Sequence, residues 1–425
     1  MKAWRVALAL ALAACRKTDV PASPDASAVA MGVASSAANE DRPVDAASVV
    51  AARCTFSLGA GEVPSTAPTD IGEAVSTPTQ IAVGLTHTLP TGKNGAIALV
   101  ATASPLAAPL LVDLGPAYGD APPPRPIARG EELYAVAYGR TTTTGTTATR
   151  DLIVSKIVAG KAVPVATLPR KLNESLAFDA ALGEKGGLLA WDEDVAPVRG
   201  VIRVAVFSAD KPASRIASPE TSDAESPRIA ARPGGYWLVW IARTPEPVRD
   251  GGGHELEGPG EDRTYAWLEL VALDEAGAPA RAVQRVTPAK GHVGAFDLAA
   301  RNGGADLDIL ARDDEEARDG AGGRLVVHSV HDQTIATQLV VPEGVGRGIP
   351  DLLPPWLVFF DATDHIRLLS FAAAAIPMAG AMKAAPASAE PALEGARPLA
   401  VTPAGLLAAF PADPKHLFRL LACSL

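Results

Sequence analysis

Residues 227–287 contain four short apolar runs in succession: PRIAARPGG (227–235), YWLVWIAR (236–243), TYAWLELVALD (264–274) and ARAVQRVT (280–287). Glycine, proline and aspartate separate the runs, and the residues within them alternate between apolar and polar or stay apolar. Short runs of this kind, bounded by turn residues, are typical of β-strands. The stretch therefore predicts one unit of four antiparallel strands.

The same order of runs recurs on both sides of this stretch, at 175–218 and at 295–341. Similar turn-then-apolar segments appear along the whole chain at intervals of about 50 residues, within the range of propeller blades. Their last residues are Val100, Tyr138, Trp191, Trp240, Ile309, Phe360 and Phe410. A repeat of this length and strand content resembles the β-propellers of secreted bacterial proteins, although no signature of a named subfamily is present.

The resemblance implies an all-β fold, a β-propeller over residues 54–425 with seven four-stranded blades as the favoured count. Six or eight blades stay open, and a pair of β-sandwiches is the alternative architecture. Trp191, Trp240 and Trp267 occupy repeated positions, so we expect them to pack between blades rather than to line a ligand cage.

Length and composition agree with an array of repeats. The chain has 425 residues, too many for one ordinary core unless the core is repeated, and its 37 Pro and 38 Gly argue against long helices. The formal net charge of −10 argues against nonspecific binding of nucleic acid.

The N-terminus has the layout of an export signal, because two basic residues precede a short apolar run at 6–14 that cannot span a bilayer. The residues Leu12, Ala13, Ala14 and Cys15 resemble the lipobox of bacterial lipoproteins. The resemblance implies a signal peptide over 1–14 and a lipid on Cys15. Because Arg16 follows the cysteine, the outer membrane is the favoured location. An ordinary secretory signal with an incidental cysteine is the alternative.

Residues 15–53 are rich in Ala, Ser, Pro and Asp and show no sustained period, which predicts a disordered tether. The expected partners are the membrane, through the lipid, and an envelope protein, a glycan or a small ligand. We expect no nucleic acid partner and a monomeric chain.

Two cysteines remain, Cys54 and Cys423, at opposite ends of the predicted propeller. Cysteines of exported proteins usually pair, and the last unit lacks a fourth strand that residues 54–58 could supply. We expect the N-terminal strand to close the last blade and Cys54 to bond Cys423. Two free buried thiols are the alternative.

Two acidic stretches fall where long loops are expected on one face, and they are the candidate ligand-face loops: Asp192, Glu193 and Asp194 in the first, and Asp313, Asp314, Glu315, Glu316 and Asp319 in the second. Carboxylates could bind Ca²⁺, but the spacing that wraps one ion is absent, so solvated loop charge is the favoured interpretation and no cofactor is predicted.

No catalytic motif stands out. His254 and Glu255 lack the second histidine of a zinc protease helix, and the chain has no nucleophile elbow or phosphate-binding loop. We therefore expect a noncatalytic binding or scaffold module. A structural subunit of an envelope complex is a further possibility.

The alternative from another class is a hydrolase or lyase with its site at the channel mouth. Candidate polar groups on the inner strands are Asp179, Arg228, Asp297 and Asp351, which would have to converge for this alternative to hold.

Overall fold

The computed structural model describes one compact unit within residues 42–425. Its described residues are 53–59, 62–118, 120–144, 147–171, 175–196, 199–207, 213–219, 223–245, 248–249, 255–256, 264–313, 324–332, 334–341, 347–353, 356–360, 366–370, 384–385, 396–402 and 405–424. The predicted signal peptide, the tether up to residue 52 and Cys15 lie outside these residues.

Six four-stranded antiparallel sheets each use a single stretch of chain. The first sheet contains β2 (Asp70–Ser76), β3 (Gln80–Leu89), β4 (Gly92–Ala101) and β5 (Leu110–Pro116). The second contains β6 (Arg125–Arg129), β7 (Glu132–Thr144), β8 (Thr147–Val158) and β9 (Lys161–Lys171). The third contains β10 (Phe178–Leu182), β11 (Gly187–Ala196), β12 (Arg199–Val206) and β13 (Ser214–Ile216).

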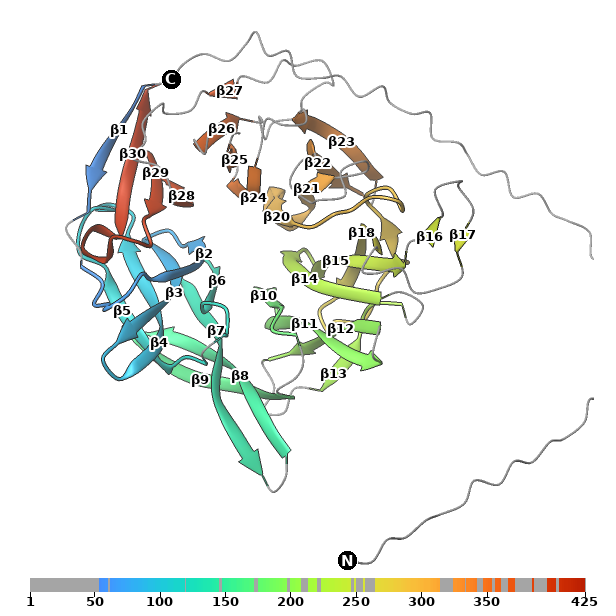
Figure 1. Ribbon diagram of the computed structural model, residues 1–425, viewed down its shortest axis with the longest axis horizontal. Coiled ribbons are helices and arrows are strands. Elements are labelled where there is room, and N and C mark those ends of the chain that lie inside the picture. Colours follow the sequence, from blue (N-terminus) through green and yellow to red (C-terminus); the bar gives the residue numbers. More distant parts are fainter. Residues whose placement is uncertain are drawn as a thin grey trace, which may run out of the picture. The chain divides into compact units, whose positions relative to one another are not determined.

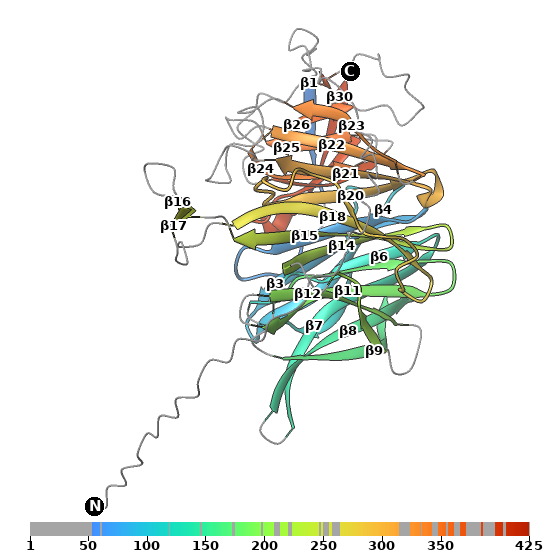
Figure 2. The ribbon, with the colours of Figure 1, turned by 90° about the vertical axis from the view of Figure 1, so that its right-hand side faces the viewer.

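The fourth sheet contains β14 (Asp223–Arg232), β15 (Gly235–Pro245), β18 (Thr264–Asp274) and β19 (Gln284–Arg285). The fifth contains β20 (Phe296–Arg301), β21 (Asp306–Asp313), β22 (Arg324–His331) and β23 (Thr334–Val341). The sixth contains β24 (Arg347–Leu353), β25 (Trp356–Phe360), β26 (Ile366–Ser370) and β27 (Ala384–Ala385). A small ribbon of β16 (Val248–Arg249) and β17 (Glu255–Leu256) is inserted between β15 and β18 and lies outside the sheets (Figure 2).

A further four-stranded sheet is composite. It holds β28 (Arg397–Thr402), β29 (Gly405–Ala409) and β30 (Phe418–Ser424) from the C-terminal end and β1 (Arg53–Leu58) from the N-terminal end, in the order β1-β30-β29-β28. The favoured count of seven blades is corrected to six that are complete within one stretch of chain, and the remaining sheet combines strands from both ends.

The sheets are arranged around a common centre, with the first strand of each unit innermost (Figure 1). These innermost strands contact one another in the order β2, β6, β10, β14, β20, β24 and β28. The chain is therefore an all-β propeller with four-stranded blades.

Apolar side chains fill the spaces between neighbouring sheets. Strand alternation sends Trp240 toward the sheet of β10–β13, where it packs with Leu188 and Ile202, while Trp237 packs with Ile309 on the opposite side. Trp191 and Trp267 are also buried. The expectation that Trp191, Trp240 and Trp267 pack between blades is confirmed.

Two strand pairs are longer than the apolar runs indicate. The threonine-rich stretch after Tyr138 extends β7 and β8 into a long hairpin, and residues 192–196, expected as a loop, extend β11. β-Branched threonine favours the extended backbone, which explains the longer hairpin. Within the described residues, no helix is long and apolar enough to cross a membrane.

Candidate functional site

Each innermost strand carries a charged residue, and six of these residues are paired with the second strand of their sheet at corresponding positions. We call this set the channel ring. Its members are Glu73, Arg125, Asp179, Arg228, Asp297, Asp351 and Arg397, and their second-strand neighbours include Val136, Ala190, Val239, Leu310, Val358 and Ala409. Glu73 lies in a β-bulge between Ile71 and Ala74.

Glu73 joins three sheets. One of its carboxylate oxygens accepts hydrogen bonds and ion pairs from Arg125 on β6 and from Arg228 on β14. Burial alone would raise the pKa of Glu73, but the two guanidinium groups hold that pKa at about 2. For Arg228, the carboxylates of Glu73, Asp179 and Asp297 outweigh the effect of burial and raise the pKa of the guanidinium group. Glu73 therefore stays ionised and bridges β2 to two other innermost strands.

Asp179 connects neighbouring sheets through the backbone. Its carboxylate accepts from the N–H of Ala180 at 2.5 Å, from the N–H of Ile229 on β14 at 2.8 Å, and from the Arg125 guanidinium. The side chain is 1% exposed, and this burial raises its pKa to about 6 although Arg125 and Arg228 act in the opposite direction. The bonds from Ile229 and Arg125 therefore tie this blade to its two neighbours.

Asp297 makes the same kind of backbone hydrogen bonds two sheets further along the chain. Its two oxygens accept from the N–H of Leu298 and from the N–H of Leu352 on β24, each at 2.8 Å. Burial raises its pKa, and Arg228 opposes that rise. In both cases the second donor is the residue that follows the ring position in the next blade.

Asp351 lacks the equivalent donors. The residue after the ring position in the next blade is Pro398, which has no N–H, and the N–H of its own successor Leu352 is donated to Asp297. The nearest ring cation, Arg397, donates to the carbonyl oxygen of Ile71. Burial and the carboxylate of Asp297 raise the pKa of Asp351 to about 7, although Arg397 opposes the rise.

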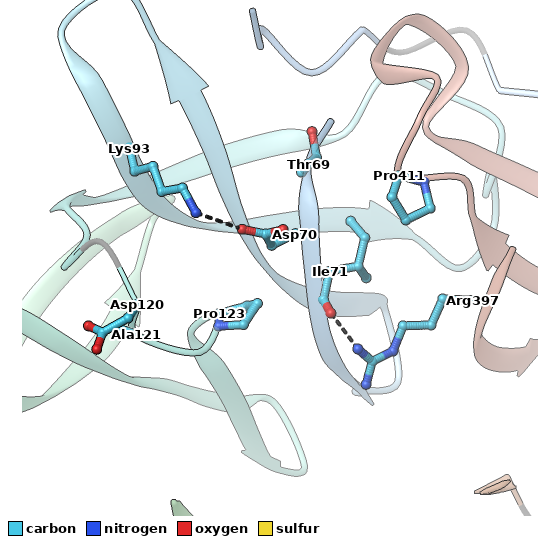
Figure 3. Close-up of a pocket in the computed structure, with 9 residues that line it drawn as sticks. All are labelled: Thr69, Asp70, Ile71, Lys93, Asp120, Ala121, Pro123, Arg397 and Pro411. Carbon is cyan, nitrogen blue, oxygen red and sulfur yellow. Dashed lines mark hydrogen bonds and ion pairs between the residues drawn. The ribbon is translucent and has the colours of Figure 1, made fainter. Parts of the chain in front are cut away.

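A cavity of about 440 Å³ opens beside the ring, between the start of β2 and the segments before β6 and after β29 (Figure 3). Ile71, Arg397, Pro123 and Pro411 line it, together with the ion pair of Lys93 and Asp70, whose Nζ and Oδ2 are 3.3 Å apart. Arg397 belongs to both the ring and the cavity wall, so the cavity adjoins the channel.

The sequence-derived candidates Asp179, Arg228, Asp297 and Asp351 all belong to this ring. Three further members, Glu73, Arg125 and Arg397, were missed. A weaker signal for them exists, since each also precedes mainly apolar residues near the start of its unit, in EAVS (73–76), RPIA (125–128) and RPLA (397–400).

The acidic loop at 192–194 needs a correction. Asp192 is 4% exposed on β11 and accepts from the N–H of Ser226 at 3.0 Å, and its burial raises its pKa. Glu193 pairs with Arg203 at 2.9 Å, while Asp194 is exposed at the end of the strand. The hairpin continues through these residues, so the first two are not solvated loop charges.

The second acidic stretch is mostly outside the described residues. Asp313 ends β21, whereas Asp314, Glu315, Glu316 and Asp319 are not described. Among the described residues, no group of three or more His, Cys, Asp or Glu side chains is arranged to hold a metal ion. Cys54 and Cys423 occupy opposite positions in the β1–β30 pairing, and no bonded cysteine pair is seen in the described part of the chain.

Comparisons with known proteins reach the fold only. No family model and no curated protein matches the chain. An apocarotenoid oxygenase of Synechocystis is 13% identical over 71% of this chain and 68% of that one, with a TM-score of 0.40.

An α-L-arabinanase of Penicillium chrysogenum is 9% identical over 71% and 91% of the two chains, with a TM-score of 0.38. The propeller domain of the Trilobed protease of Pyrococcus furiosus is 8% identical over 76% and 98%, with a TM-score of 0.34. Likenesses of this strength carry no function from one chain to another.

Proposed function

We propose that this chain is a noncatalytic binding propeller of the bacterial cell envelope, with its ligand site at the mouth of the channel. The observation that carries the proposal is the occupation of the ring carboxylates. Glu73 is held by two arginines, and Asp179 and Asp297 each accept two backbone N–H groups. Carboxylates engaged in this way stabilise the fold and are not free to attack or deprotonate a substrate.

The envelope location rests on the sequence. The lipobox resemblance at 12–15 and the polar stretch that follows support a lipid on Cys15 and a tether that keeps the propeller near the membrane. The test is metabolic labelling of the full chain in bacteria with a clickable fatty acid. We expect label on the wild type and none on Cys15→Ser. Equal label on both would overturn the anchor.

We further propose that the composite sheet is the seventh blade and closes the ring. The support is that β28 contacts β24 on one side and β2 on the other, while β1 pairs with β30 over six consecutive residues without a shift. In that register the Cα atoms of Cys54 and Cys423 are directly opposite. Opposite Cα atoms in antiparallel strands are about 4.5–5.5 Å apart, which is within the range that a disulfide requires.

A hydrolase is the second candidate, because one observation favours it. A carboxyl group with a pKa of about 7, on Asp351, shares the ring with an ionised carboxylate whose pKa is about 2, on Glu73. Carboxyl groups whose pKa values are pushed apart can serve as a general acid and its partner.

A turnover assay separates the two candidates. The purified full chain is incubated with chromogenic glycosides, esters and peptides, beside Asp351→Asn and Glu73→Gln. The binding proposal predicts that wild type and variants release product at the same background rate. Turnover by the wild type that Asp351→Asn abolishes would establish the hydrolase instead.

A further inference from the structure

The channel ring is short of one positive charge. It contains four carboxylates and three guanidinium groups, and the partners of three carboxylates are on the same ring or on adjacent backbone. Asp351 accepts no hydrogen bond from the residues that the structure describes. Among the described residues, Asp351 is therefore the ring carboxylate that has no hydrogen-bond donor.

Within the described part of the chain, two donors that could compensate Asp351 are missing or engaged elsewhere. A backbone N–H at position 398 would match those that Ile229 gives to Asp179 and Leu352 gives to Asp297. Pro398 is buried at that position and has nothing to donate. Arg397 directs a guanidinium N–H to the carbonyl oxygen of Ile71 instead.

Asp351 is also reachable. Its side chain belongs to a partly exposed residue, whereas the equivalent Asp179 is 1% exposed. The cavity of about 440 Å³ adjoins the ring at Arg397, which is the ring member next to Asp351 along the circle of innermost strands. The cavity is therefore close to the ring, although Asp351 is not among the residues that line it.

We propose that Asp351 binds the primary ammonium group of a small ligand at the mouth of the channel. This inference rests on the proposed binding function and names the chemical class of its ligand. A primary ammonium group is compact and carries one positive charge and three N–H donors. It can therefore supply the missing charge and donors at Asp351 while Arg228 stays paired with Glu73. A charge-assisted hydrogen bond to a carboxylate is stronger than a hydrogen bond between two neutral groups.

Protons compete with the ammonium group for the same oxygens. The charged groups that act on Asp351 are Asp297 and Glu73, which favour its protonation, and Arg397 and Arg228, which oppose it. Because the pKa of Asp351 is raised to about 7, the carboxyl is mostly protonated at pH 5.5 and ionised at pH 8.5. Ammonium binding is therefore stronger at the higher pH.

The test is a calorimetric titration of the detergent-solubilised full chain with methylammonium chloride. Sodium chloride and tetramethylammonium chloride at equal ionic strength are the controls for charge and for size. We expect saturable binding of methylammonium at pH 8.5, weaker by about tenfold or more at pH 5.5 and in Asp351→Asn. Asp332→Asn is the matched control, since that side chain is 94% exposed, and it retains wild-type affinity.

A second variant keeps the test decisive if Asp351→Asn fails to fold. Pro398→Ala supplies the missing backbone N–H, so we expect it to fold and to bind methylammonium several-fold more weakly than the wild type. No saturable binding at pH 8.5, or binding unchanged in both variants, would overturn the inference. If methylammonium does not bind and the turnover assay is also negative, the noncatalytic proposal still stands. Turnover in that assay would overturn the noncatalytic proposal whatever the binding result.

Discussion

At the scale of single residues, the same aspartate side chain has different surroundings at three ring positions. Asp179 and Asp297 receive a backbone N–H from the next blade, at Ile229 and Leu352, while the equivalent position for Asp351 is Pro398, which has no N–H. The number of donors that reach a carboxylate decides how readily it stays ionised. A single proline thus separates a structural carboxylate from one available to a ligand.

Glu73 should be the most sensitive ring position. Glu73→Gln removes the charge that compensates Arg125 and Arg228, both partly buried, and leaves two cations without their partner. We expect a loss of about 2–4 kcal/mol in the free energy of unfolding, measured by urea denaturation. Glu132→Gln is the control, because the Glu132–Lys156 pair is exposed, and it should have no measurable effect. Equal effects of the two variants would contradict the role of Glu73.

Asp351 should make stability depend on pH near neutrality. Its pKa is about 7 in the folded chain and about 4 in an unfolded one, so between these values the folded state binds more protons. Stability therefore falls as the pH rises through this window. Asp179, with a pKa of about 6, contributes to the lower part of the fall.

Urea denaturation of wild type and Asp351→Asn between pH 5 and 8 checks this dependence. Between pH 5 and 7 the variant should lose less stability than the wild type, and above about pH 7.5 the two curves should run parallel. Parallel curves for the two proteins over the whole range would show that Asp351 does not titrate there.

Sequence reasoning reached part of the site. The charged residues of DAAL, RIAA and DLAA stood out as polar positions on apolar inner strands, so Asp179, Arg228 and Asp297 were predicted. Arg397 and Glu73 were missed because a proline and a β-bulge obscure their strands. Asp192 was misplaced because a hairpin extended by its cross-strand partner has no local sequence signal.

At the scale of elements, glycine sets how closely neighbouring blades approach the ring. Gly84 on β3 is opposite the bulge that carries Glu73, and a Cβ there would lie 1.6 Å from the carbonyl oxygen of Pro124. Only a residue without a side chain allows the segment before β6 to pass so close. The strands themselves were predictable from apolar runs and turns, whereas this contact between distant segments was not.

Gly84→Ala should therefore destabilise the fold. We expect a loss of about 1–3 kcal/mol from overpacking, because the clash is with backbone and cannot be relieved by a rotamer change. Gly294→Ala is the matched control, since no atom lies within 4 Å of the added Cβ, and its melting temperature should equal that of the wild type. A wild-type melting temperature for Gly84→Ala would contradict the close approach.

At the scale of the whole molecule, the excess length of the chain is explained by repetition around one centre. The propeller and its four-stranded blades followed from a repeat of about 50 residues. The count was harder to predict, because the apolar segments indicate seven units whereas six sheets are complete within one stretch of chain.

The proposed disulfide would link the paired strands β1 and β30 covalently and so close the ring of blades. Two thiols would lose two protons and two electrons to the disulfide of an envelope thiol oxidant. For the full chain purified from membranes without reductant, peptide mapping should find Cys54 linked to Cys423. Reduction should lower the melting temperature by several degrees, because the bond closes almost the whole propeller into one loop. Free thiols at both positions before reduction would exclude the bond.

The central claim is that the channel ring holds one unmatched carboxylate, at Asp351, that a ligand can compensate. Its most direct test is a carbon-13 NMR titration of the Asp351 carboxyl, assigned with Asp351→Asn. We predict a midpoint near pH 7 without ligand and a lower midpoint in saturating methylammonium chloride, with no shift in sodium chloride. A midpoint near pH 4, unmoved by methylammonium, would contradict the account.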